Sequence, residues 1–248
     1  MICVILAAGY ATRMYPLTEN FPKPLLEVGG KAILDWLVDD LAPVTGRFVV
    51  VSNHKYAEHF VRWAAGKPVT VVDDGTETNE TRLGAVRDIA FAMDRLGLKD
   101  DLLVIAGDNV LDFSLRSFVD YAREAGTSCT MRYREEDPVK LRRSGISEMD
   151  GERLVSFEEK PENPRSQWCT PPFYYYTAAD AARIGEAIRD GCGTDAPGSL
   201  VAWMCKKSPM HSMEMPGKRY DIGNLESYAA VRDSYRGPEP YTGRRDHA

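Results

Sequence analysis

Short apolar runs alternate with helix-periodic segments through the first 106 residues, and this alternation limits the folds open to the chain. The runs are apolar at successive positions, as in strands buried on both faces, whereas the segments between them carry apolar side chains at helical spacing. The expected strands are 2–7, 47–52, 69–72 and 102–106, and the expected helices are 32–41, 56–65 and 83–96. Because parallel strands need crossover connections, the pattern predicts an α/β fold with a Rossmann-like, doubly wound, mixed but mainly parallel sheet.

The second half of the chain has shorter strand-like runs split by turns. The expected strands are 129–133, 145–148, 154–158, 173–176 and 210–215, and the expected helices are 178–190, 198–206 and the end of 220–231. No stretch has the composition of a linker, so we expect a single domain over 1–236. Residues 237–248 are rich in Pro, Gly and charge and are expected to form a disordered tail.

Charge and cysteine usage exclude several classes of protein. The 31 Lys and Arg residues against 37 Asp and Glu give a formal net charge of −6, which argues against a nucleic-acid surface. The five cysteines are odd in number and lack CxxC spacing, so we expect reduced thiols in a cytoplasmic protein. The apolar run 2–8 is too short for a signal peptide or a membrane span.

The loop after the first strand, AAGYATRMYPLTENFPKP at 7–24, combines small residues, cations and prolines. Ala7, Ala8 and Gly9 would expose backbone N–H groups at the carboxyl edge of the sheet, where ligands bind. Arg13 could clamp phosphate oxygens, and Lys23 could add a compact positive charge. The prolines restrict the loop and so reduce the entropy lost on binding. Taken alone, the loop is equally compatible with an ordinary surface turn.

Residues 6–31, LAAGYATRMYPLTENFPKPLLEVGGK, resemble the signature LAAGxGTRLxPLTxxxPKPLLxVxGKP of the sugar-1-phosphate nucleotidyltransferases, or NDP-sugar pyrophosphorylases. The chain is similar to glucose-1-phosphate thymidylyl- and uridylyltransferases in this respect. The resemblance implies the fold of that family and a Mg²⁺-dependent reaction of a nucleoside triphosphate with a sugar 1-phosphate, giving an NDP-sugar and pyrophosphate. It also implies that the nucleotide binds in residues 1–125 and the sugar phosphate in 126–236.

The same resemblance assigns roles to the loop. It implies that the backbone of Leu6, Ala7, Ala8 and Gly9 wraps the nucleotide, that Arg13 holds the phosphates and the leaving pyrophosphate, and that Lys23 also contacts phosphate. Ala11 stands where the family usually has its second glycine. We expect a methyl group there to be tolerated if φ is negative.

Two aspartates lie in segments that resemble the metal-binding motifs of the family. Asp108 in AGDN follows the expected strand 102–106, and Asp221 lies in YDIGNLESY. Either residue could instead cap a helix or a turn. The resemblance implies that both carboxylates bind Mg²⁺, which prefers hard oxygen donors, and that Asp108 is catalytic together with Arg13 and Lys23.

Further segments resemble the base- and sugar-binding parts of the family. TNETRLGAVRDI at 78–89 places Gly84 against the nucleobase, and Asn79 where some members have a base-reading Gln. FEEKP at 157–161 resembles F-x-E-K-P, which implies that Glu159 binds sugar hydroxyls and Lys160 the sugar phosphate. In each case a surface loop or a solvated ion pair is the alternative.

Two more residues are predicted to bind the sugar substrate. Gly145 would leave room for the sugar ring, by resemblance to a family strand. Tyr175 belongs to an aromatic run of which alternate residues could reach a pocket, the others packing in the core.

Two other functions remain open from the sequence. A cytidylyltransferase acting on phosphocholine or an aminophosphonate could cage an ammonium group with Trp168 or Tyr175, although the EEKP segment argues for a sugar phosphate. A catalytically silent, nucleotide-binding regulatory subunit would be expected to lack one of the cations or metal aspartates. The sequence predicts no nucleic-acid or membrane partner, is compatible with a homo-oligomer, and specifies neither the base nor the sugar.

Overall fold

The computed structural model describes residues 1–220 and 222–243, so Asp221 and residues 244–248 lie outside the described residues. The chain forms two compact units that are interleaved in sequence. The N-terminal unit comprises residues 2–82, 106–117 and those from 216 onward, and the central unit comprises Met1, 83–105 and 118–215. The assignment of nucleotide and sugar phosphate to 1–125 and 126–236 stays a prediction.

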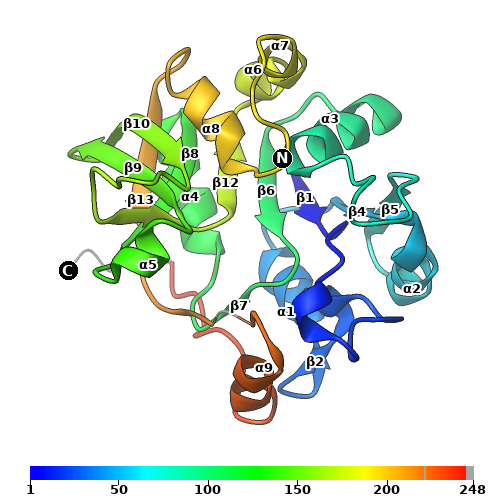
Figure 1. The fold of residues 1–248 in the computed structure, drawn as a ribbon. Helices are drawn as coiled ribbons and strands as arrows, with labels where there is room; N and C mark the ends of the chain where they lie inside the picture. Colours follow the sequence, from blue (N-terminus) through cyan, green and yellow to red (C-terminus); the bar gives the residue numbers. More distant parts are fainter. Residues whose placement is uncertain (221, 244–248) are drawn as a thin grey trace. The chain divides into compact units, whose positions relative to one another are not determined.

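Three parallel strands form the sheet of the N-terminal unit, in the order β1, β4, β5 (Figure 1). Val4 pairs with Val49 and Val50 with Val71, and all five residues of β4 are buried, as predicted for strands covered on both faces. The elements of this unit are β1 (Ile2–Leu6), η1 (Thr12–Met14), η2 (Lys23–Leu25), β2 (Glu27–Val28), β3 (Lys31–Ala32), α1 (Ile33–Leu41), β4 (Phe48–Ser52), α2 (His54–Ala64), β5 (Val69–Asp73), β7 (Val110–Leu111), β14 (Arg219–Tyr220) and α9 (Leu225–Arg232).

Local chemistry ties the helices of this unit to its loops. Asn53 caps α2 by accepting a hydrogen bond from the Tyr56 backbone N–H at 3.0 Å, and its side-chain amide donates to the Ala8 carbonyl at 2.9 Å. One buried side chain therefore fixes both the start of α2 and the beginning of the 7–24 loop. Met14 of that loop belongs to an apolar cluster that also includes Ile33, Val110, Ile222 and Tyr235.

The central unit contains a mixed sheet in the order β11-β9-β10-β13-β8-β12-β6. β13 pairs parallel with β8, whereas β9, β10, β11 and β12 pair antiparallel with their neighbours. Its elements are α3 (Ala85–Leu96), β6 (Leu102–Ala106), α4 (Arg116–Ala125), β8 (Ser128–Arg134), α5 (Pro138–Leu141), β9 (Gly145–Asp150), β10 (Arg153–Glu159), β11 (Trp168–Thr170), β12 (Phe173–Tyr176), α6 (Ala178–Ala181), α7 (Ile184–Arg189), α8 (Gly198–Met204) and β13 (Met210–Glu214), β6 ending and α4 beginning in residues of the N-terminal unit.

The predicted α/β class is confirmed, and the parallel pairing is confirmed for β1, β4 and β5. The prediction of a mainly parallel sheet does not extend to the central unit. There a tight turn at Gly151, which has a φ of 59°, connects β9 directly to β10, and so short a connection permits antiparallel pairing alone. No helix in residues 1–220 or 222–243 has the length and apolar character needed to cross a membrane.

The described part of the predicted disordered tail, residues 237–243, contains no helix or strand but does contact other residues of the N-terminal unit. The Glu239 N–H donates to the Asp112 carbonyl at 2.8 Å, and the Arg116 guanidinium lies 4.6 Å from the centroid of the Tyr241 ring. The predicted disorder of residues 237–248 stays a prediction.

Candidate active site

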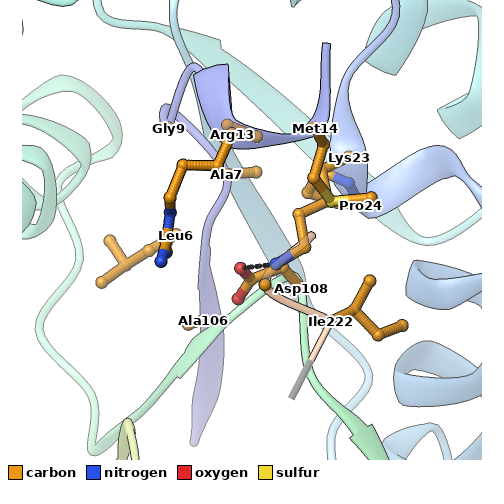
Figure 2. Close-up of a pocket in the computed structure, with 12 residues that line it drawn as sticks. Leu6, Ala7, Gly9, Arg13, Met14, Lys23, Pro24, Ala106, Asp108 and Ile222 are labelled. Carbon is orange, nitrogen blue, oxygen red and sulfur yellow. Dashed lines mark hydrogen bonds and ion pairs between the residues drawn. The ribbon is translucent and has the colours of Figure 1, made fainter. Parts of the chain in front are cut away.

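A cavity of about 260 Å³ lies in the N-terminal unit, beyond the carboxyl end of β1. Parallel α/β sheets usually bind ligands at this edge. Its lining combines the predicted phosphate loop, the start of η2, the turn after β6 and the segment before α9 (Figure 2). The lining residues are Leu6, Ala7, Gly9, Ala11, Arg13, Met14, Lys23, Pro24, Ala106, Asp108, Ile222 and Gly223. The structure thus brings together six residues that the sequence analysis selected: Leu6, Ala7, Gly9, Arg13, Lys23 and Asp108.

The start of the loop is held by backbone hydrogen bonds and leaves space in front of Gly9. The Ala7 N–H donates to the Val51 carbonyl at 2.9 Å, and the Gly107 N–H donates to the Leu6 carbonyl at 2.9 Å. A Cβ atom built on Gly9 would meet nothing within 4 Å. Ala8 is buried and does not line the cavity. A ligand can therefore approach the backbone at Gly9, whereas Ala8 anchors the loop through Asn53.

Ala11 adopts a left-handed backbone conformation, with φ 45° and ψ 42°. The condition of a negative φ is therefore not met, and the positive value explains why a glycine suits this position. The carbonyl of Ala11 accepts hydrogen bonds from the Met14 N–H at 2.9 Å and the Thr18 hydroxyl at 2.8 Å. These two bonds hold the strained turn that presents Arg13.

We expect Ala11→Gly to raise the free energy of unfolding by about 1 kcal/mol, because relief of the left-handed strain exceeds the entropy that glycine adds to the unfolded chain. Urea denaturation would measure the change. Ala42→Gly is the matched control, because Ala42 has a φ of −52° and the same substitution there should be destabilising. An Ala11→Gly protein that is less stable than the wild type would contradict the argument.

Lys23 and Asp108 form an ion pair in the cavity, with 2.5 Å between Nζ and Oδ2 (Figure 2). The Lys23 side chain is 10% exposed and that of Asp108 is 43% exposed. Burial acts to raise the pKa of Asp108, but the charge and hydrogen bond of Lys23, together with the charge of Arg219, outweigh it and lower the pKa. Asp108 is therefore a carboxylate at neutral pH.

Arg13 lines the same cavity from η1 and is exposed. Within residues 1–220 and 222–243 its guanidinium makes no hydrogen bond or ion pair. The cavity thus holds one cation paired with a carboxylate and one whose donors are available to an anion. A guanidinium of this kind suits bidentate binding of phosphate oxygens.

The residues of the cavity fit a divalent metal ion in part. Asp108 supplies a hard oxygen donor, but the described residues contain no group of three or more His, Cys, Asp and Glu side chains that could hold a metal by themselves. The second predicted ligand, Asp221, lies outside the described residues, while its neighbours Ile222 and Gly223 line the cavity. Oxygens of a bound phosphate would have to complete the coordination.

In the central unit, the structure brings Gly145, Glu159 and Lys160 together at the end of the β9–β10 hairpin. Gly145 pairs with Glu159, and a Cβ on Gly145 would overlap the Phe157 ring and lie 3.3 Å from Glu159 Oε2. A Cβ on Gly198 would overlap the same Glu159 oxygen. Gly198 could not be selected from the sequence, because its APG context signals no more than the start of a helix.

The electrostatics of this hairpin end are set by burial and by Lys160. Burial raises the pKa of Glu159, Lys160 opposes the rise, and Asp195 adds to it. Lys160 Nζ lies 4.0 Å from Glu159 Oε1, and the Lys160 side chain is 56% exposed. Lys160 and Ala11 are the two non-glycine residues with positive φ in the part of the chain that the structure describes. Such strain is concentrated at functional sites in proteins.

Gly84, Asn79 and Tyr175 lie outside the cavity lining. Gly84 has a φ of 89° and precedes α3, whose first N–H groups, on Ala85 and Val86, donate to the carbonyls of residues 195 and 194. Asn79 is exposed and accepts a bond from the Arg82 guanidinium through its carbonyl. Tyr175 is buried and donates its hydroxyl to Asp101 at 2.6 Å. These placements give Gly84 and Tyr175 structural roles, and the three predicted ligand contacts stay predictions.

Gly84→Ala should lower the free energy of unfolding by about 3 kcal/mol, from left-handed strain and overpacking combined. The new Cβ would lie 2.5 Å from the Thr194 carbonyl oxygen and 2.8 Å from the Asp195 Cα, both in the backbone. Gly97→Ala is the matched control, since Gly97 has a φ of 61° and no atom within 4 Å of such a Cβ. Denaturant unfolding of both variants tests this, and equal losses would show that the contact with residues 194–195 is unimportant.

The sequence profile described as "Nucleotidyl transferase" matches residues 2–236. The chain belongs to the nucleotidyl transferase family. A Haloferax volcanii protein named UTP–glucose-1-phosphate uridylyltransferase AglF is 30% identical over 184 residues, which cover 72% of this chain and 73% of that protein. A Sulfolobus acidocaldarius protein assigned as a mannose-1-phosphate guanyltransferase is 30% identical over 178 residues, covering 70% of this chain and 47% of that protein.

The fold is that of known nucleotidyl transferases. A UDP-glucose pyrophosphorylase solved with UDP-glucose superposes with a TM-score of 0.78, at 18% identity, over 95% of this chain and 98% of that one. The predicted family and fold are therefore confirmed. The chain spans about half the length of several curated relatives, between 47% and 59%.

Proposed function

We propose that the protein joins a nucleoside triphosphate to a sugar 1-phosphate, releasing pyrophosphate and an NDP-sugar. The observation that carries the proposal is the cavity of the N-terminal unit, where Arg13, Lys23 and Asp108 lie together beyond the end of β1. All three belong to motifs that resemble those of sugar-1-phosphate nucleotidyltransferases, and the named relatives are transferases of this class.

In the proposed reaction an oxygen of the sugar phosphate attacks the α-phosphorus of the triphosphate. The bond from that phosphorus to the bridging oxygen of the β-phosphate breaks, and pyrophosphate leaves with its electron pair. No covalent enzyme intermediate is needed, so the chain acts by positioning and charge neutralisation. Arg13 would bind the phosphates that leave, because its guanidinium is the cation of the cavity with available donors.

The ion pair between Lys23 and Asp108 would separate when the nucleotide binds. In the structure each neutralises the other. A triphosphate offers Lys23 a more highly charged anion, so nucleotide binding would release the Asp108 carboxylate to hold Mg²⁺, with Asp221 as the proposed second ligand. The bound Mg²⁺ would supply charge neutralisation on the phosphates.

The sugar phosphate is proposed to bind at Gly145, Glu159 and Lys160. Glu159 can accept hydrogen bonds from sugar hydroxyls, and the exposed amine of Lys160 can bind the phosphate. The Lys160 N–H donates to the Ser144 carbonyl at 3.1 Å, which holds the strained backbone from which this side chain extends. The Phe157 ring fills the space where a side chain at 145 would stand, so the glycine lets Phe157 and Glu159 pack directly against the backbone of β9.

The two alternative functions receive less support. The Trp168 ring is already covered by Arg132 and Arg134, whose guanidinium carbons lie 5.0 Å and 5.4 Å from its centroid, so it would repel a quaternary ammonium group. Tyr175 is buried and bonded to Asp101. A silent subunit would not need Arg13, Lys23 and Asp108 in one cavity.

The test is pyrophosphate release with Mg²⁺, with ATP, GTP, CTP, UTP and dTTP each paired with glucose 1-phosphate, mannose 1-phosphate, other sugar 1-phosphates and phosphocholine. Release with one nucleotide and a sugar phosphate supports the proposal and identifies both substrates. Release with CTP and phosphocholine alone, or no release from any pair despite nucleotide binding, would overturn it.

The five cysteines are free in the structure, which supports a proposed cytoplasmic location.

A further inference from the structure

A two-stranded ribbon, formed by β7 and β14, joins the two chain segments that carry the predicted metal ligands. Leu111 pairs with Arg219 and Val110 with Tyr220, in an antiparallel register. Asp108 precedes the ribbon by two residues on one strand, and Ile222 follows it by two residues on the other. The ribbon therefore sets the spacing between the Asp108 turn and the cavity-lining segment 222–223.

Backbone and side-chain bonds reinforce the ribbon at its far end. The Asp112 N–H donates to the Lys218 carbonyl at 3.1 Å, and the Lys218 N–H donates to Asp112 Oδ1 at 2.6 Å. The Tyr235 hydroxyl donates to the Leu111 carbonyl and anchors the ribbon to the segment after α9. This end of the ribbon is held without any contribution from the Arg219 side chain.

At the cavity end, Arg219 makes the connection. Its Nη1 donates to Asn109 Oδ1 at 3.3 Å, and the Asn109 side-chain amide donates to the Ala106 carbonyl at 2.8 Å. Asn109 is 2% exposed, so its amide has a fixed orientation. Arg219 thereby ties β14 to both ends of the short turn that presents Asp108.

We propose that Arg219 is a positioning residue, which acts through Asn109 to hold the Asp108 carboxylate in register with segment 222–223. The inference rests on the proposed function of the cavity, in which Asp108 is a metal ligand whose carboxylate must be placed accurately. Residues that orient a metal ligand typically change metal affinity or activity by about 10- to 100-fold when they are removed.

The experiment measures binding of Mn²⁺ by electron paramagnetic resonance in the presence of inorganic triphosphate, a probe that needs no knowledge of the base. The proteins are the wild type, Arg219→Met, Asn109→Ala, the double variant and Arg62→Met. The last removes one positive charge from α2, outside the cavity lining. The half-saturating Mg²⁺ concentration, the KM for sugar phosphate and kcat are measured on the same proteins.

We expect Arg219→Met to weaken Mn²⁺ binding and raise the half-saturating Mg²⁺ concentration by about 10-fold, with the KM for sugar phosphate unchanged. Asn109→Ala should do the same or more, since it also loses the bond to Ala106. Adding Arg219→Met to Asn109→Ala should weaken metal binding no further.

Two outcomes would overturn the inference: Arg219→Met binding Mn²⁺ as tightly as Arg62→Met, or additive losses in the double variant. A wild type that binds Mn²⁺ with triphosphate but releases no pyrophosphate from any substrate pair would refute the proposed function instead. In that case the metal-binding comparison still decides the role of Arg219.

Discussion

Replacing Asp108 with asparagine is expected to lower the rate of pyrophosphate release by about 1,000-fold, the scale of losing one essential electrostatic group. The amide has nearly the shape of the carboxylate but no charge, so it is a poor ligand for Mg²⁺. The measurement is kcat at saturating substrates over a wide range of Mg²⁺ concentrations. If the wild-type rate returned at high Mg²⁺, the carboxylate would serve affinity rather than catalysis.

The same substitution has a structural cost that can be separated from its catalytic effect. Lys23 would keep its buried amine and lose its anionic partner. Because the Asp108 side chain is 43% exposed, solvent screens the pair, and we expect the free energy of unfolding to fall by about 1 kcal/mol or less. Asp39→Asn is the matched control, since Asp39 pairs with Lys31 at 2.7 Å on the surface, outside the cavity lining. It should leave the rate of release unchanged.

Arg13→Lys is expected to lower the rate of pyrophosphate release by about 100-fold while leaving the thermal unfolding temperature unchanged. Lysine keeps the charge but cannot hold two phosphate oxygens with one planar group. In the described chain the Arg13 guanidinium makes no hydrogen bond or ion pair, so its removal breaks no interaction of the folded protein. Steady-state kinetics, triphosphate binding and thermal unfolding together test this.

Arg47→Lys is the control for Arg13, because Arg47 is an exposed arginine of the same unit that does not line the cavity. It should match the wild type in all three measurements. An Arg13→Lys protein that released pyrophosphate at the wild-type rate would show that charge alone suffices at this position. The bidentate role would then be abandoned.

The parts of the fold that could be predicted from the sequence are those determined by local patterns. β1, β4, β5 and β6 were found within a residue of their ends, because buried parallel strands are continuous apolar runs. The location of the cavity could also be predicted, because the 7–24 loop directly follows β1 at the carboxyl edge of the sheet. The helix predicted over 178–190 is broken into α6 and α7, and α4 was not predicted, although Phe118, Val119 and Ala122 give it an apolar face.

The parts that could not be predicted depend on long-range pairing or on the sign of a backbone angle. β7 and β14 have two residues each, which is too few for a periodic pattern, and they are about 110 positions apart. The hydrogen bond between Arg219 and Asn109 depends on that pairing, so it could not be predicted from the sequence either. The positive φ of Ala11 could not be read from an alanine, because this conformation is one that alanine rarely adopts.

The interleaving of the two units has a consequence for synthesis. The N-terminal unit takes its residues from three separate stretches of the chain, and its cavity needs Ile222 and Gly223 from the last of them. During synthesis the phosphate loop leaves the ribosome long before Ile222 and Gly223, which line the same cavity. Nascent chains that stop short of residue 222 would therefore carry the signature loop without a complete pocket, and we expect no contiguous fragment that ends before that point to form the whole cavity.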